Sequence, residues 1–215
     1  MAVRCSEDST LKPVLLVIAG PNGSGKTTVT VRLRRERWSE GVEYINPDDI
    51  AQERFGGWNE PRAVIAAAEW AAKRREALLA ERAGLAFETV LSVSDKIQFV
   101  ARAVEAGYFV RVFFVGTSDP TINAARVAAR VMNGGHVVPI DKIISRYARS
   151  MANLQALFGL ADCVYIYDNS VDRVDASLCA QVREGELRKI YGALPEWVEQ
   201  ALKGLAPSTD FVDLR

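Results

Sequence analysis

The chain has little cysteine, a single histidine and no excess of either charge. Its three cysteines, Cys5, Cys163 and Cys179, are an odd number at spacings that fit neither a zinc site nor a disulfide framework. Lysine plus arginine number 27 and aspartate plus glutamate number 27, so no global positive charge favours nucleic acid or an anionic membrane. Any phosphate binding must therefore be local, and we expect neither a nucleic-acid partner nor a membrane partner.

Long apolar runs are also missing. No stretch approaches the roughly 18 residues of a membrane span, and residues 1–12 carry acids where a signal peptide would carry an apolar segment. We therefore expect a cytoplasmic protein with reduced cysteines. The length of 215 residues and the hydrophobic content of 49% predict a single folded domain over residues 1–215.

Strand and helix signals alternate along the chain. Apolar runs predict strands at 13–19, 43–46, 85–90, 108–115 and 161–167. Helical patterns lie at 26–40, 61–83, 94–106, 119–132 and from 140 to about 157. This alternation predicts an α/β fold with a parallel sheet of about five strands between helices, in which ligands bind at the carboxyl ends of the strands. The tail, residues 171–215, is poorly patterned and suggests only a hairpin through 176–189 and a helix after Pro195.

One motif carries a clear chemical meaning. Residues 20–27, GPNGSGKT, satisfy the phosphate-loop pattern G-x-x-x-x-G-K-[ST] and lie between a buried strand and a helix, as the motif requires. Backbone N–H groups turn inward around phosphates, Lys26 reaches the β and γ phosphates, and Thr27 ligates Mg²⁺. The candidate nucleotide-binding residues here are Gly20, Pro21, Asn22, Gly23, Ser24, Gly25, Lys26, Thr27 and Thr28.

Carboxylates follow the second and third predicted strands. In a simple βαβ arrangement the second strand lies beside the first, so that Asp48 faces the γ-phosphate and accepts the proton of an attacking hydroxyl, or holds Mg²⁺ through water. Alternatively, Asp48 or Asp49 caps a helix that starts at Pro47. Glu88, next to Thr89 at the end of the third strand, is a candidate for Mg²⁺ or a substrate hydroxyl, or a solvated strand end.

A helix with two arginines precedes a glycine break. Arg126 and Arg130 share one helix face, and residues 126–139 could close as a lid that brings a guanidinium to the transferred phosphate. His136 lies just beyond the break, where it could bind phosphate or cap the next helix. Arg146 faces either the same phosphates or solvent. Alternatively, Arg126 and Arg130 are simply solvated on the surface of their helix.

Several of these stretches, taken in order, resemble the zeta-toxin-like branch of P-loop kinases. They are GPNGSGKTT, INPDDIA, FETVLS, RVAARVMNGGHVVP, RYARSMANL and IYDNS, and they cover most of residues 14–170. The resemblance implies a five-stranded parallel core, ATP or GTP as phosphate donor with Mg²⁺, and an inhibitory protein partner. It further implies phosphorylation of a hydroxyl on a small metabolite, a UDP-activated amino sugar in the best-known members.

The resemblance also assigns roles to residues. By motif, Lys26 and Thr27 match the phosphate loop, Asp48 the catalytic base, Glu88 a substrate-site acid and Arg130 a phosphate clamp. Asn169, in IYDNS, matches a loop that lies against adenine, while Thr89 and His136 join the substrate site. His136 stands where toxin-type members have a second clamping arginine, and a neutral imidazole stabilises phosphate charge less. The competing interpretations are a nucleotide-dependent switch and, less favoured, a kinase of nucleic-acid ends.

Overall fold

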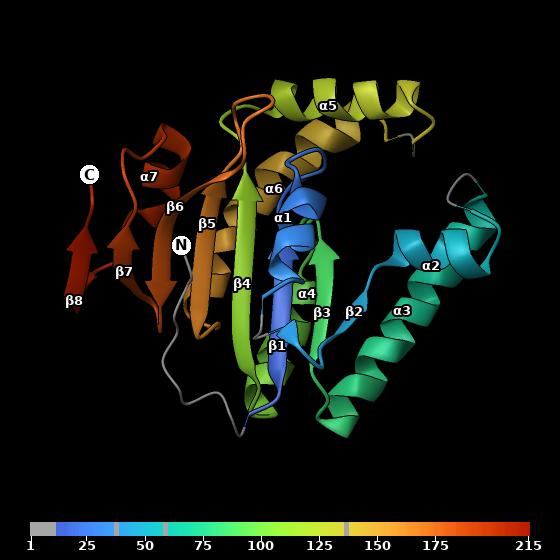
Figure 1. The fold of residues 1–215 in the computed structure, drawn as a ribbon, viewed down its shortest axis with the longest axis horizontal. Helices are drawn as coiled ribbons and strands as arrows, with labels where there is room; N and C mark the ends of the chain where they lie inside the picture. The colour runs from blue at the N-terminus through green and yellow to red at the C-terminus, as the bar shows by residue number, and fades with distance from the viewer. Residues whose placement is uncertain (1–11, 37–38, 58–59, 136–137) are drawn as a thin grey trace.

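A computed structural model describes residues 12–36, 39–57, 60–135 and 138–215, which form one sheet with helices against both faces (Figure 1). The strands are β1 (Val14–Ala19), β2 (Glu43–Ile45), β3 (Leu85–Thr89), β4 (Phe109–Gly116), β5 (Cys163–Asp168), β6 (Ser177–Arg183), β7 (Glu186–Ile190) and β8 (Pro207–Asp213). The helices are α1 (Lys26–Leu33), α2 (Pro47–Arg54), α3 (Pro61–Glu81), α4 (Asp95–Glu105), α5 (Pro120–Met132), α6 (Ile140–Phe158) and α7 (Glu196–Leu202).

The sheet has eight strands in the order β2-β3-β1-β4-β5-β6-β7-β8. The first five are parallel, as predicted, whereas β6 and β7 are added antiparallel and β8 pairs parallel with β7. The expected total of about five strands is therefore too low, because it counts only the parallel core. The predicted hairpin in the tail is confirmed as β6 and β7, and the helix after Pro195 as α7.

The neighbour expected for β1 was wrong. β3, not β2, pairs with β1 on one side, and β2 lies outside β3. Burial explains the order: Leu15 and Val17 of β1 are fully buried, so this apolar strand takes a central place, while the short β2 contains the partly exposed Glu43 and Tyr44 and takes the edge. Asp48, which follows β2, thus stands one strand further from the phosphate loop than predicted.

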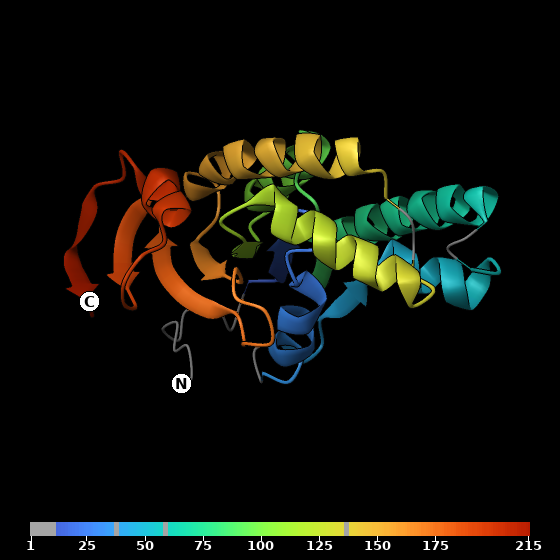
Figure 2. The same cartoon turned by 90° about the horizontal axis from the view of Figure 1, so that it is seen from above.

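Helices cover the two faces unequally. Figure 2 shows α1 on one face and α4 and α6 on the other, with α5 lying across the carboxyl ends of the parallel strands. The larger buried cluster joins β1 to α3, α4 and α6 through residues such as Val17, Phe99 and Leu154, while a smaller cluster on the α1 face includes Leu16, Phe113 and Tyr165. The α1 helix ends at Leu33, earlier than predicted, and the Ser39 hydroxyl donates to backbone carbonyls in the turn that follows.

The C-terminal extension supports the end of β5. The indole of Trp197, in α7, packs against Gly116 of β4 so closely that a Cβ atom there would lie 2.4 Å from the ring. Its Nε1 donates to Asp168 Oδ1 at 2.7 Å, and the Ser170 hydroxyl donates to the same oxygen at 2.5 Å. The α7 helix therefore holds in place the segment that leaves β5 toward the phosphate loop.

Two further expectations concern cysteine and membranes. Cys163 and Cys179 are buried thiols, in keeping with the expected reduced state, while Cys5 lies outside the described residues. Across the part of the chain that the structure describes, every helix is too short or too polar to cross a bilayer.

Candidate nucleotide and phosphoryl-transfer site

Left-handed glycines shape the phosphate loop, residues 20–28. Gly20, Gly23 and Gly25 have φ angles of 143°, 74° and 92°, a region that other side chains disfavour. A Cβ atom on Gly20 would lie 2.1 Å from the carbonyl oxygen of Val115. The α1 helix begins directly after the last of these glycines, at Lys26, so its positive dipole end faces the loop. The loop therefore has the form of an anion site.

The Lys26 side chain folds over its own loop. Its Nζ donates to the carbonyl oxygens of Gly20 and Pro21, at 2.8 Å each. Burial lowers the pKa of the Lys26 ammonium to about 8; the nearby Glu88 carboxylate opposes this shift and Arg130 adds to it. An ammonium that has lost part of its hydration gains strongly from a phosphate oxygen, so Lys26 is suited to bind a polyphosphate.

Glu88 is the centre of a hydroxyl cluster and not a solvated strand end. Its carboxylate accepts from Thr30 Oγ1 at 2.6 Å, from the Tyr44 hydroxyl at 2.8 Å and from Thr27 Oγ1 at 3.4 Å. Thr30 and Tyr44 were not predicted. The first could have been found from its position, because it lies three residues after Thr27 on one helix face; Tyr44 carries no comparable signal. The cluster fixes an acid beside the predicted magnesium ligand.

Thr89 shapes the turn after β3. Its hydroxyl accepts from the backbone N–H of Leu91, which has a left-handed φ of 56°, and its carbonyl oxygen accepts from the N–H of Gly20. Thr89 thus links β3 to the phosphate loop through backbone and side chain together.

Asn46, and not Asp48 or Asp49, caps α2. The side-chain oxygen of Asn46 accepts from the N–H of Asp48 at 3.0 Å, so the capping alternative for the two aspartates was wrong. Asp48 is exposed and lines the cavity described next. Burial raises the pKa of the Asp49 carboxyl, and the carboxylate of Glu88 raises it further, so these acids share one negative region.

A cavity of about 500 Å³ lies above the phosphate loop and brings most of the predicted residues together. It is lined by Asn22, Gly23, Gly25, Lys26, Thr27, Asn46, Pro47, Asp48, Glu88, Thr89, Val90, Arg126, Val127, Arg130, Val138 and Arg146. Arg146 of α6 lines this cavity, so a role toward the phosphates stays a prediction. His136 lies outside the described residues. Ser24 is fully buried and does not line the cavity.

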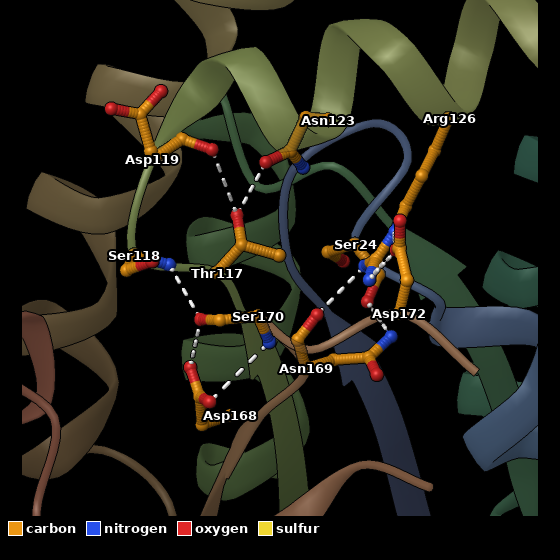
Figure 3. Close-up of polar contacts among 10 residues, drawn as sticks. All are labelled: Ser24, Thr117, Ser118, Asp119, Asn123, Arg126, Asp168, Asn169, Ser170 and Asp172. Carbon is orange, nitrogen blue, oxygen red and sulfur yellow. Dashed lines mark hydrogen bonds and ion pairs between the residues drawn. The ribbon is translucent and has the colours of Figure 1, made fainter. Parts of the chain in front are cut away.

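A smaller cavity of about 250 Å³ adjoins the first and contains Thr28 and Asn169. Arg126 borders both cavities and donates to the Asn169 carbonyl oxygen at 2.7 Å and to Asp172 Oδ1 at 2.6 Å and 2.9 Å (Figure 3). Asn169 thus borders a cavity beside the phosphate loop, and its contact with adenine stays a prediction. Its side-chain amide, however, donates to the Ser24 carbonyl oxygen at 2.8 Å, and so holds the phosphate loop.

The residues present fit a magnesium ion bound together with phosphates. The Thr27 hydroxyl lies beside the Glu88 carboxylate, and Asp48 lines the same cavity, which supplies the oxygen chemistry that Mg²⁺ prefers. Within the described residues no cluster of three or more acids, histidines or cysteines forms an all-protein metal cage.

Comparisons with known proteins agree with the geometry. A family model described as "Zeta toxin" matches residues 2–179. An uncharacterised protein of Haemophilus influenzae is 30% identical over 128 residues, which is 60% of this chain and 88% of that protein.

Solved structures share the fold. A structure from the PezAT toxin-antitoxin system of Streptococcus pneumoniae is 18% identical, with a TM-score of 0.60 over 92% of this chain and 85% of that chain. The complex AvrRxo1-ORF1:AvrRxo1-ORF2 with sulphate ions is 17% identical, with a TM-score of 0.62 over 93% of this chain and 65% of that one. The related complex with ATP is 16% identical, with a TM-score of 0.57 over 93% of this chain and 65% of that one. The fold is therefore that of P-loop kinase-like proteins.

Proposed function

Since the chain belongs to the zeta toxin family, we propose that it is a kinase that transfers the γ-phosphate of ATP, or of GTP as alternative donor, to a hydroxyl of a small metabolite. One observation carries the proposal: Lys26, Asp48 and Arg130 line a single cavity above the phosphate loop. A UDP-activated amino sugar is the acceptor that the family resemblance favours. The AvrRxo1-ORF1:-ORF2 complex was solved with ATP, which supports the nucleotide assignment.

In the proposed reaction the acceptor hydroxyl forms a bond to the γ-phosphorus. The bond from that phosphorus to the bridging β–γ oxygen breaks, and ADP leaves with the electron pair. Asp48 takes the hydroxyl proton, while Lys26 and Arg130 neutralise charge on the phosphoryl oxygens. Arg126, held at Asn169 and Asp172, borders the nucleotide side of the cavity.

Magnesium, when bound, would neutralise the β and γ phosphates and orient them. Thr27 would hold the ion directly, and Glu88 would hold it through water or contact the acceptor hydroxyl. Thr30 and Tyr44 keep the Glu88 carboxylate in place for either role. The remaining positive charge of the cavity comes from Arg146, which is suited to an acceptor that carries phosphate.

The direct test is a screen of nucleotide sugars and nucleosides for ADP release that depends on the acceptor. A kinase should release ADP at least tenfold faster with one acceptor class than with water alone. The alternative function is a nucleotide-dependent switch that hydrolyses ATP slowly and signals by its shape. Hydrolysis that no acceptor accelerates, together with nucleotide binding, would favour the switch over the kinase.

We further propose that residues 126–139 act as a lid, of which 136–137 lie outside the described residues. The α5 helix ends at Met132, Gly134 adopts a left-handed φ of 83°, and the Gly135 N–H bonds back to the Arg130 carbonyl oxygen at 3.0 Å. Closure would bring the exposed Arg130 onto the phosphates. Amide hydrogens of residues 128–135 should exchange more slowly with a non-hydrolysable ATP analogue, whereas those of α4, which contributes no residue to the cavity lining, should be unaffected. Equal exchange with and without the analogue would exclude the lid.

The expected inhibitory protein partner stays a prediction. The Streptococcus pneumoniae structure comes from a toxin-antitoxin system, and that pairing belongs to that protein. The cytoplasmic location likewise stays a prediction for this chain.

A further inference from the structure

Two side-chain amides hold the phosphate loop from outside. Asn123 Nδ2 donates to the carbonyl oxygen of Asn22 at 2.6 Å, and Asn169 Nδ2 donates to the carbonyl oxygen of Ser24 at 2.8 Å. Asn123 projects from α5 and is fully buried, whereas Asn169 follows β5. Figure 3 shows both asparagines directed at the loop from different elements.

The geometry of the peptide bond determines where the N–H groups of the next residues point once these carbonyls are held. In a planar trans peptide the C=O and the next residue's N–H point in opposite directions. When Asn123 holds the Asn22 oxygen, the N–H of Gly23 therefore points away from α5; when Asn169 holds the Ser24 oxygen, the N–H of Gly25 points away from the β5 loop. Both glycines line the large cavity.

The contacts are close enough to leave little freedom. A Cβ atom on Gly23 would lie 2.6 Å from the backbone oxygen of Asn123, and one on Gly25 would lie 2.2 Å from Asn169 Nδ2. Within the described residues, the hydrogen bonds of the structure include no protein acceptor for the N–H of either glycine. The direction of each of these two N–H groups is therefore fixed, and each is available to donate to an anionic ligand.

Both asparagines are themselves fixed by further hydrogen bonds. The Thr117 hydroxyl donates to Asn123 Oδ1, which leaves the nitrogen end of that amide toward the loop (Figure 3). The Tyr147 hydroxyl donates in turn to the Thr117 carbonyl oxygen at 2.6 Å. Asn169 donates its backbone N–H to Gly116 at 2.9 Å. The loop is therefore connected through two short chains of contacts to β4 and α6.

We propose that Asn123 and Asn169 are positioning residues that direct the N–H groups of Gly23 and Gly25 into the phosphate cavity. Because Asn123 lies on α5, the same contact also ties the first turns of that helix to the loop. The shape of the loop does not depend on the kinase assignment; the effect on nucleotide binding rests on the proposed function. Asn169 then acts on the nucleotide through the loop, in addition to any contact with the base.

The test is NMR relaxation of the Gly23 and Gly25 N–H groups in the full chain without nucleotide, combined with ATP·Mg²⁺ binding by calorimetry. Asn123→Ala should lower the order parameter of the Gly23 N–H from about 0.85, the value of a rigid backbone, to below about 0.6, because the Asn22 carbonyl loses the hydrogen bond that fixes the peptide plane. Asn169→Ala should do the same to the Gly25 N–H through the Ser24 carbonyl. Each variant should weaken ATP binding by about tenfold. If Asn123→Ala does not fold, Asn123→Asp keeps the acceptor for Thr117 and removes the donor. Because it also adds a negative charge beside the loop, only the order parameter of the Gly23 N–H is compared for this variant, and not its ATP affinity.

Asn153→Ala is the matched control. Asn153 Nδ2 donates to the carbonyl oxygen of Leu91 at 2.8 Å, so it makes the same kind of contact outside the phosphate loop. This variant should lower the melting temperature but leave the order parameters of the loop N–H groups and the ATP affinity unchanged. Unchanged order parameters at Gly23 and Gly25 in the loop variants, or equal effects in the control, would overturn the proposal. Lowered order parameters in a chain that binds no nucleotide would support the loop geometry and refute the kinase function alone.

Discussion

Asp48→Asn is expected to reduce phosphoryl transfer to the acceptor by roughly 10²- to 10⁴-fold, the range for loss of a general base. Asparagine has the same size but cannot accept the hydroxyl proton. ATP affinity should change little, because Lys26 and the loop backbone carry the phosphate contacts. Asp48 is exposed in the cavity and Asn46 caps α2, so the melting temperature should stay the same. Steady-state rates, calorimetry and melting on one variant measure all three quantities.

The neighbouring Asp49→Asn provides the matched control for this variant. It removes one carboxylate from the same turn, and transfer should fall by less than about tenfold, since Asp49 has no assigned proton to accept. A second outcome for Asp48→Asn is informative: if ATP affinity falls only in the presence of Mg²⁺, Asp48 holds the metal instead. Full acceptor turnover in Asp48→Asn would end the general-base assignment.

Lys26→Ala is expected to weaken ATP·Mg²⁺ binding by about 30- to 150-fold, which corresponds to about 2 to 3 kcal/mol for a strong charge-assisted hydrogen bond. The fold should persist, since the hydrogen bonds of the Lys26 ammonium with described residues are to the loop carbonyls of Gly20 and Pro21 and not to the core. Calorimetry gives the affinity, and circular dichroism checks the fold. Unchanged ATP affinity would show that the phosphate loop is not part of the nucleotide site.

The lowered pKa of Lys26 adds a pH dependence to this prediction. In the free protein the ammonium loses its proton at about pH 8, and phosphate oxygens would favour the charged form and raise that pKa. Binding then takes up a proton above about pH 8, so ATP affinity should fall as pH rises from about 8 to about 10. Lys26→Arg keeps a charge that does not titrate in this range, and its affinity should lose that slope.

The parallel core could be predicted from the sequence because most of its strands, such as β1 and β4, are mainly apolar. Each of the five predicted strands is present within one or two residues of its expected bounds. The position of β2 could not be predicted, since periodicity reports burial and not which strand is the neighbour. β8 was missed because its sequence, PSTDFVD, begins with proline and is largely exposed, as suits an edge strand.

For the candidate site, the sequence motifs identified the residues that would contact a ligand. They did not identify the residues that position those groups. Lys26, Asp48, Glu88 and Arg130 stand in patterns with chemical meaning, and the cavity brings them together. Asn123 stands in no such pattern, because a buried amide that supports a loop is recognised only once helix and loop are adjacent. The same holds for the hydroxyl groups around Glu88, which come from separate elements.

The separation along the chain of the groups that hold the phosphate loop has a consequence for folding. Asn123 and Asn169 follow their partners Asn22 and Ser24 by 101 and 145 residues, and β1 pairs with strands that come much later. Such long-range contacts require large loops to close before they stabilise anything, which slows their formation. During synthesis from the N-terminus, the glycine-rich segment thus leaves the ribosome early but acquires its native shape only after residue 169 has followed. The proposed nucleotide binding would therefore be a property that the nascent chain gains late.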